Sequence, residues 1–211
     1  MARNHAREER LALCDLLTDL GPDQPTLCAG WTTRDLAAHL VARERRPLAA
    51  PGLVWQPLSG YTDWVRRSLA RRPFPALVET LRRPPRWAPT AVDRLDRAIN
   101  TLEMFIHHED VRRSQPGTAP RELPAALEAA LWLRIRPFAR LRLRRFPAPV
   151  IVHARGYDEV RTGRGEGEPV RVSGEPGELA LFLTGRQAAA RAALTGPEDL
   201  AGRLATARLG L

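Results

Sequence analysis

A glutamate and a histidine stand four residues apart near the middle of the chain, and both side-chain types bind metal ions. Glu103 and His107 lie in a predicted helix that runs to about Arg113. Residues four apart in a helix project from consecutive turns on one side of it. Because a carboxylate oxygen and an imidazole nitrogen are both ligands of zinc, the pair predicts two ligands of one divalent cation.

The apolar residues of the same helix indicate which way the pair faces. They recur at helical spacing and form a stripe that is expected to face the core: Val92, Leu95, Ile99, Leu102 and Ile106. At about 100° of rotation per residue, Glu103 and His107 lie on the flank of this stripe. The same geometry predicts that His108 points away from the core.

A third ligand is expected from a helix predicted over residues 33–46. Leu36 and Leu40 define its apolar face, and His39 lies on the same half of the helix surface. Three ligands that converge between helices leave one position open, which is typical of a catalytic zinc site. Spacing alone leaves an alternative open, because a single inward histidine is often a hydrogen-bonded core residue.

Several segments resemble a known family. Residues 28–40, CAGWTTRDLAAHL, followed by RERRP at 43–47, resemble the GW(S/T)xxDLxxHL signature of the mycothiol-dependent maleylpyruvate isomerase-like family. This family belongs to the DinB/YfiT-like superfamily of four-helix bundles. Residues 103–113, EMFIHHEDVRR, resemble its second signature, and residues 174–186 are similar to its C-terminal domain. The resemblance implies that His39, Glu103 and His107 bind a divalent metal, with zinc expected.

The resemblance also implies thiol chemistry. The metal would bind the sulfur of mycothiol, the low-molecular-weight thiol of actinobacteria, and a metal-bound thiol is deprotonated near neutral pH. The thiolate could add to an activated double bond in an isomerisation, or attack an electrophile in a transfer reaction. Arg43 and Arg46, one and two turns beyond His39, are candidate contacts for a substrate carboxylate, with solvated side chains as the alternative. His108 and Asp110 are candidate hydrogen-bond partners of a ligand, and Asp110 is better placed by its angle on the helix.

Capping residues, prolines and glycines mark the elements that must position these side chains. Thr32 and Thr90, each followed three residues later by an aspartate, are the predicted caps of two helices. Helices are predicted over residues 6–20, 33–46, 61–70 and 75–82, and the longest helix follows the cap at Thr90 and runs to about Arg113. Another is predicted over 123–144, kinked or interrupted at Pro137. Short β-rich runs follow at 150–154, 159–162 and 170–173, and further helices at 177–185 and 197–207.

These elements predict an α+β fold with two domains. Residues 1–146 are expected to form a DinB-like four-helix bundle that holds the metal site. Residues 147–211 are expected to form a small α/β domain, near the lower size at which a domain folds alone.

Composition restricts the remaining classes of function. The net charge is +9 and the pI about 11.2. However, all 33 basic residues are arginines, spread along the chain among 24 acidic residues, so a nucleic-acid partner is not expected. The absence of an apolar run of about 18 residues and of a secretory signal predicts a cytoplasmic protein with no membrane partner. Cys14 and Cys28 are too few for a disulfide framework and are expected to be buried, reduced thiols.

The main hypothesis is a metal-dependent, mycothiol-using transferase or isomerase that acts on a small electrophilic substrate, as a monomer or a homodimer. The alternative is a non-enzymatic protein in which the metal is structural or the basic surface binds nucleic acid. An open coordination position favours the enzyme, and a closed one favours the structural metal. Affinity that falls steeply with salt would indicate nucleic-acid binding.

Overall fold

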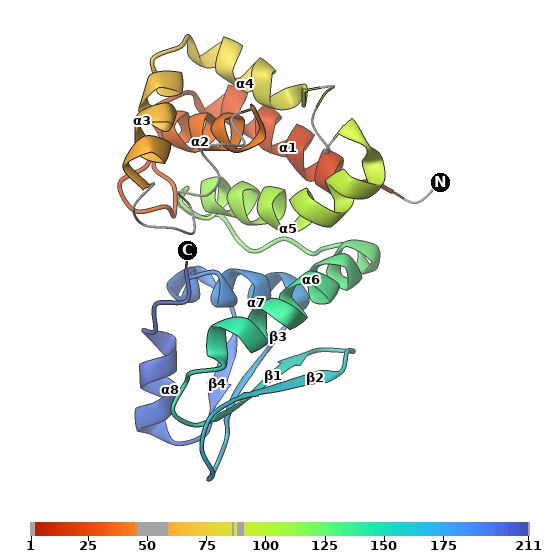
Figure 1. Cartoon of the computed structure of the whole chain (residues 1–211), viewed down its shortest axis with the longest axis vertical. Helices are drawn as coiled ribbons and strands as arrows, with labels where there is room; N and C mark the ends of the chain where they lie inside the picture. The colour runs from red at the N-terminus through yellow and green to blue at the C-terminus, as the bar shows by residue number, and fades with distance from the viewer. Residues whose placement is uncertain (1–2, 46–58, 86, 88–90, 211) are drawn as a thin grey trace. The chain divides into compact units, whose positions relative to one another are not determined.

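The computed structural model describes residues 3–45, 59–85, 87 and 91–210. The chain divides into two compact units, Met1–Pro120 and Arg121–Leu211, each of which is described by itself. The N-terminal unit is helical (Figure 1). Its helices are α1 (His5–Leu20), α2 (Thr33–Arg45), α3 (Ser59–Ala70), α4 (Phe74–Arg82) and α5 (Asp93–Arg112).

Short polar side chains fix where the first two helices begin. Asn4 caps α1, because its side-chain oxygen accepts a hydrogen bond from the backbone N–H of Arg7 at 3.2 Å. Thr32 and Asp35 form the predicted capping box of α2: the Thr32 backbone N–H donates to the Asp35 carboxylate at 3.2 Å, and the Asp35 backbone N–H donates to the Thr32 hydroxyl at 3.4 Å. Thr90, the other predicted cap, lies outside the described residues.

The core of the N-terminal unit lies among its helices. Helix α1 packs on α5 and α4, and α2 packs on α3 and α4. The largest fully buried apolar side chains in it come from four of the five helices: Leu13, Leu17, Leu36, Leu40, Leu77, Leu81, Met104 and Phe105. Because α2 and α5, the helices that carry the candidate ligands, both contribute residues to this core, their mutual position is fixed by packing.

Helix α5 is rotated from the orientation that its apolar pattern predicts. Val92, Leu95 and Ile99 are exposed by 56%, 42% and 46%, so the prediction that they face the core is wrong. Asp96 and Asn100 are buried instead. The polar side chains can face inward here because each meets hydrogen-bonding partners on neighbouring helices, which offsets the cost of burying them.

The C-terminal unit is a small mixed sheet with helices. In chain order its elements are α6 (Ala125–Leu143), β1 (Pro149–Ala154), β2 (Glu159–Gly163), β3 (Val170–Gly174), α7 (Pro176–Leu183), the 3₁₀ helix η4 (Gln187–Ala189), β4 (Ala193–Thr195) and α8 (Glu198–Ala205). The strand order is β2-β1-β3-β4. Strand β1 pairs antiparallel with β2 and parallel with β3, and β3 pairs antiparallel with β4.

Register aligns the buried valines of this sheet. Val150 lies opposite Val170, and Val152 lies opposite both Val160 and Val172. All five are completely buried. Helix α6 packs on β1 and β2, α7 packs on β3, and the two helices contact each other (Figure 1). The three strands predicted from the sequence are confirmed, and the short strand β4 was missed.

Helix α6 differs from its prediction in two ways. It runs from Ala125 to Leu143 without interruption, although Pro137 lies inside it. Its contacts join it to the sheet of the second unit, whereas the sequence pattern predicts it in the bundle. The predicted α+β class is confirmed; the four-helix arrangement and the boundary after residue 146 stay predictions.

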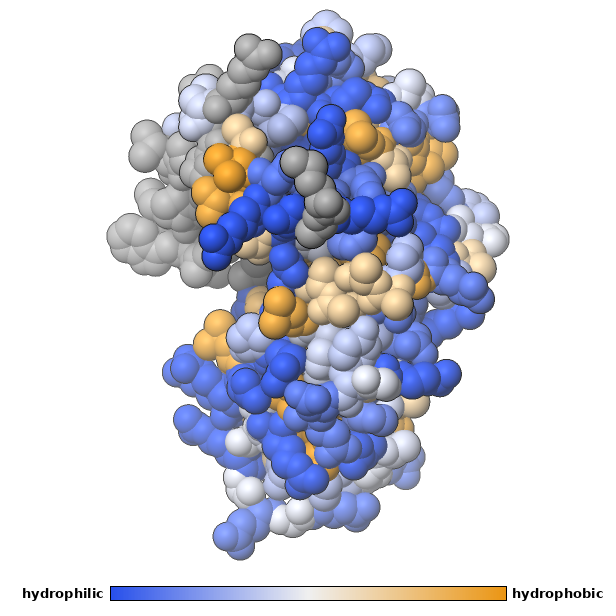
Figure 2. Space-filling model, turned by 90° about the vertical axis from the view of Figure 1, so that its right-hand side faces the viewer, coloured by the Kyte–Doolittle hydropathy of each residue, from blue (hydrophilic) through white to orange (hydrophobic). Residues whose placement is uncertain are grey.

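Hydrophilic residues cover most of the protein surface that Figure 2 presents, with hydrophobic ones in small groups between them. Among the described helices, none is both long and apolar enough to cross a membrane.

Candidate metal centre

The structure brings the three predicted ligands together from two helices. His107 Nε2 lies 3.3 Å, and His39 Nε2 lies 3.6 Å, from Oε1 of Glu103. The two imidazole rings are 5.2 Å apart between centroids, and one donor atom from each of the three residues lies within 4.8 Å of the others. Ligands bound at about 2.1 Å to a tetrahedral zinc ion are separated by roughly 3.4 Å. The three side chains therefore fit a divalent cation.

Burial and hydrogen bonding set the charges of this cluster. Burial acts to raise the pKa of Glu103, but hydrogen bonds from His107 and His39 outweigh it and hold that pKa well below its usual value. The carboxylate is therefore ionised. Burial lowers the pKa of His39, which favours the neutral imidazole that a metal needs.

His107 lies between two carboxylates. Burial acts to lower its pKa, but hydrogen bonds with Asp110, Cys28 and Glu103 hold the pKa well above its usual value. Its Nδ1 donates to Oδ2 of Asp110 at 2.9 Å, and the Asp110 side chain is completely buried. This hydrogen bond orients the ring so that Nε2 faces Glu103 and His39, as outer carboxylates do for histidine ligands of metals.

Cys28 is a member of the site that sequence reasoning missed. Its Sγ donates to Oδ2 of Asp110 at 3.2 Å, and Cys28, Asp110 and His107 form a second group of possible ligands. The backbone N–H of Leu27 also donates to the carbonyl of Asp110, at 3.0 Å. Of the two thiols expected to be buried, Cys14 is buried and Cys28 is partly exposed. Its place at the start of the segment that leads to His39 was the available signal.

Arg43 is held within the cluster. Its Nε lies 3.3 Å from Oε1 of Glu103, and its Nη1 donates to Oδ1 of Asn100 at 2.6 Å. Only 19% of the side chain is exposed. The predicted contact of Arg43 with a substrate carboxylate stays a prediction, and Arg46 lies outside the described residues.

His108 faces the interior, contrary to its prediction. It was expected to point away from the core, but it is buried and its Nδ1 donates to Oε2 of Glu9 at 2.8 Å. Glu9 belongs to α1, which packs along α5. The prediction is wrong because α1 covers this side of the helix as well, which the apolar pattern of α5 alone does not indicate.

An aromatic side chain covers His39. The Trp31 ring lies 5.1 Å from the His39 ring between centroids. The guanidinium of Arg66 lies over the Trp31 ring at 5.0 Å and forms ion pairs with Asp35 and Asp63. These contacts restrict the rotation of both rings.

Comparison with known proteins gives a match of fold. No family model matches the sequence, and no curated protein matches it. Two solved structures do match: that of the mycothiol-dependent maleylpyruvate isomerase, with a TM-score of 0.58, and that of a mutant of it, with a TM-score of 0.57. Each is 15% identical, and the match covers 92% of this chain and 92% of the other. This chain has the fold of the mycothiol-dependent maleylpyruvate isomerase. At this identity the likeness to the isomerase concerns the fold alone.

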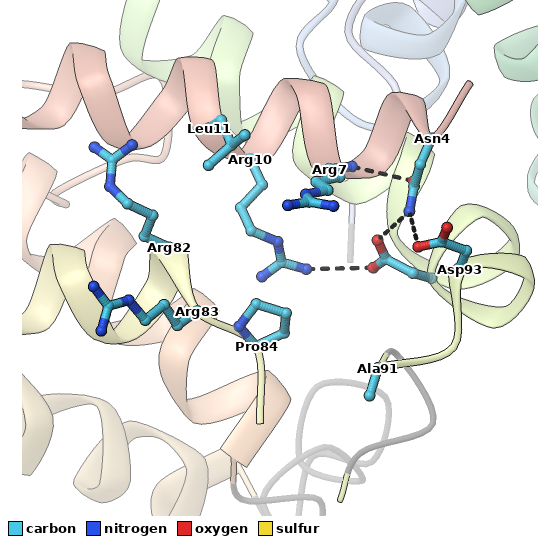
Figure 3. A pocket seen from close by; sticks show the side chains of 10 residues that line it. Asn4, Arg7, Arg10, Leu11, Arg82, Arg83, Pro84, Ala91 and Asp93 are labelled. Carbon is cyan, nitrogen blue, oxygen red and sulfur yellow. Dashed lines mark hydrogen bonds and ion pairs between the residues drawn. The ribbon is translucent and has the colours of Figure 1, made fainter. Parts of the chain in front are cut away.

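A separate hollow of about 360 Å³ lies between the N-terminal end of α1 and the C-terminal end of α4 (Figure 3). Its lining consists of Asn4, Arg7, Arg10, Leu11, Arg82, Arg83, Pro84, Ala91, Asp93 and Asp96. None of the three candidate ligands lines it. Two of its residues, Arg10 and Asp96, belong to a buried polar cluster that extends toward Glu103.

Proposed function

We propose that the protein is a metal-dependent enzyme of the cytoplasm that uses mycothiol to isomerise, or to transfer the thiol to, a small electrophilic substrate. The observation that carries this proposal is the cluster of His39, Glu103 and His107. The isomerase whose fold the chain shares depends on mycothiol, which supports this choice of thiol, although a fold alone does not fix a reaction.

The chain's own residues supply the positions that such chemistry needs. A divalent cation, with zinc proposed, would bind the thiol sulfur and stabilise its thiolate, the nucleophile of either reaction. Asp110 keeps His107 oriented, and Trp31 keeps His39 oriented. The side chain of Glu103 is 25% exposed, so solvent reaches the cluster. Arg43 and Arg46 remain proposed contacts for a substrate carboxylate.

Metal content tests the ligand assignment. The purified protein should contain zinc or another divalent metal near stoichiometry, and His39→Ala and His107→Ala should lose most of it because two ligands hold a cation far less tightly than three. His153→Ala is the matched control, since His153 lies on β1 in the other unit. Circular dichroism checks that each variant folds. Equal metal content in all four proteins would contradict the assignment.

Thiol binding separates the enzyme from a structural metal protein. We expect mycothiol added to the cobalt-loaded protein to produce a thiolate-to-cobalt absorption band, because three protein ligands leave one position open. Cobalt that is bound but gives no such band at saturating thiol would indicate a closed, structural site. Loss of the band in His39→Ala would then tie the thiol to this cluster.

A further inference from the structure

A fully buried asparagine connects the metal cluster to a second polar cluster. Nδ2 of Asn100 donates to Oδ1 of Asp96 at 2.8 Å and to Oε1 of Glu44 at 3.3 Å. Its Oδ1 accepts from Nη1 of Arg43 at 2.6 Å. Both the oxygen and the nitrogen of the Asn100 amide are therefore hydrogen-bonded. Their partners on α2 and α5 fix the orientation of the amide.

Glu44 and Asp96, the carboxylate partners of Asn100, are both bound by a residue of α1. Arg10, with 1% of its side chain exposed, binds Glu44 through two nitrogens at 2.6 Å each and Asp96 at 3.3 Å. Asn4 also donates to Asp96, at 3.1 Å. Asn4, Arg10 and Asp96 all line the hollow of Figure 3. A bidentate, buried guanidinium of this kind has little freedom to move. Asn100 is thus held by a rigid support.

At the metal cluster, the connection through Asn100 places the positive charge of Arg43 beside Glu103, a candidate metal ligand. With Nη1 held by Asn100, the planar guanidinium of Arg43 directs its Nε at Oε1 of Glu103. This is the same oxygen that His39 and His107 approach. Arg43 therefore lies in direct contact with a candidate metal ligand, one residue away from any cation that the cluster holds.

The formal charges around the cluster indicate how Arg43 affects the binding of a further ligand. A divalent cation together with the carboxylates of Glu103 and Asp110 would be neutral overall, and Arg43 adds one positive charge in direct contact with Glu103. The carboxylates of Glu44 and Asp96 are paired with Arg10 and lie beyond Asn100, so they compensate Arg43 less at the cluster. The added charge favours an anion over a neutral molecule at the open position.

We infer that Arg43, held in place by Asn100, selects an anionic ligand for the open position of the metal cluster. Arg43 is then a specificity-determining residue, and Asn100 is a positioning residue that acts through it. This inference rests on the proposed function, because it requires a cation at His39, Glu103 and His107. It explains how the site would prefer a thiolate to water or to an uncharged side chain.

The test measures ligand preference in the cobalt-loaded protein, by the change in its visible absorption. Thiocyanate serves as the anionic probe and imidazole as the neutral one. Arg43→Gln should weaken thiocyanate binding at least about tenfold and leave imidazole binding within about twofold, because only the anion loses a Coulombic partner. Arg43→Lys should recover part of the thiocyanate affinity. Equal weakening of both probes, or of neither, would overturn the inference.

Two further variants separate charge from position. Arg45→Gln removes an arginine from the same helix, but Arg45 donates to the carbonyls of Thr80 and Arg83, so both affinities should stay unchanged. Asn100→Leu keeps the guanidinium and removes its anchor, and should weaken thiocyanate binding by less than Arg43→Gln does. In an Arg43→Gln background, Asn100→Leu should add nothing. An additional loss there would show that Asn100 does not act through Arg43.

Cobalt affinity distinguishes the two ways of failing. If the wild-type protein binds no cobalt, the proposed function fails. If it binds cobalt with unaltered anion preference in Arg43→Gln, only the inference fails. We expect Arg43→Gln to bind cobalt at least as tightly as the wild type, because a like charge next to the cation is removed. Loss of cobalt binding in this variant would mean that Arg43 is needed for the metal site to form, and not that it sets the ligand preference of the site.

Discussion

Two cysteines with the same chemistry lie in different surroundings. Cys14 is completely buried among the helices of the N-terminal unit, and its Sγ donates to the carbonyl of Val78 at 3.8 Å. Burial raises the pKa of the Cys14 thiol to about 12, although the nearby arginines Arg82 and Arg10 act in the opposite direction. Cys28 is partly exposed and contacts Asp110. Cys14 is thus a packing residue, whereas Cys28 belongs to the candidate site.

The raised pKa makes Cys14 unreactive in the native protein. At about pH 8, a thiol with a pKa near 12 is a thiolate in only about one molecule in 10⁴, and the thiolate is the reactive form. We expect iodoacetamide to leave Cys14 unmodified in the native protein and to alkylate it in concentrated urea. Mass spectrometry of the peptide that contains Cys14 measures both. Native labelling as fast as in urea would contradict this prediction.

One guanidinium joins three helices. Arg10 lies on α1, and its two carboxylate partners lie on α2 and α5: Glu44 and Asp96. This cluster explains why α5 buries polar residues and exposes part of its apolar stripe. Helix packing in this unit therefore depends on ion pairing as well as on apolar burial.

Loss of Arg10 should destabilise the fold strongly. Arg10→Met leaves two buried carboxylates without their guanidinium, and we expect the free energy of unfolding to fall by about 3–5 kcal/mol. Arg7→Met is the matched control, because Arg7 is exposed on the same helix and should change that energy by no more than about 0.5 kcal/mol. Urea denaturation of both variants gives the comparison. Equal losses would mean that the ion pairs do not hold α1 in place.

Local sequence signals predict the elements better than their orientation. Thr32 and Asp35 mark the start of α2 because a capping box is complete within four residues. The rotation of α5 is not visible locally, because Asn100 meets Glu44 from a distant part of the chain. His108 was misplaced for the same reason, since its partner Glu9 lies 99 residues away.

The candidate site was predictable only in part. Spacing pairs Glu103 with His107, the apolar face of the helix over residues 33–46 adds His39, and the resemblance supports all three. Arg43 was predicted at the site as a substrate contact, but the sequence does not reveal that it contacts Asn100. Nor does it reveal that Cys28 contacts Asp110, because these contacts join residues 57 and 82 positions apart. Side chains that touch ligands through the tertiary fold carry no fixed spacing that a motif could record.

At the scale of the whole molecule, the chain forms two units. The boundary that the residue contacts define differs from the boundary that the sequence predicts. Contacts divide it at Pro120 and group α6 with the sheet. The change in sequence texture after residue 146 suggested a later boundary, because α6 resembles the preceding helices in its local pattern. Where a helix belongs depends on the surface that it buries.

Limited proteolysis can locate the boundary. We expect trypsin to cut within residues 113–124, between α5 and α6, before it cuts at the exposed Arg144 and Arg145 that precede β1. Mass spectrometry of the first fragments identifies the cut. A fragment that begins at residue 145 or 146, formed ahead of any that begins within 113–124, would instead support the boundary predicted from sequence.

The hydrogen bonds that connect the segment before α2 to α5 have a further consequence. Leu27 and Cys28 both donate to Asp110, and Asp110 in turn orients His107. Because these hydrogen bonds need no cation, we expect them to hold His107 in place in the metal-free protein as well. A chelator would therefore empty the centre without melting the helices, unlike zinc fingers, which unfold when demetallated. Loading and release of the metal would then be uncoupled from folding.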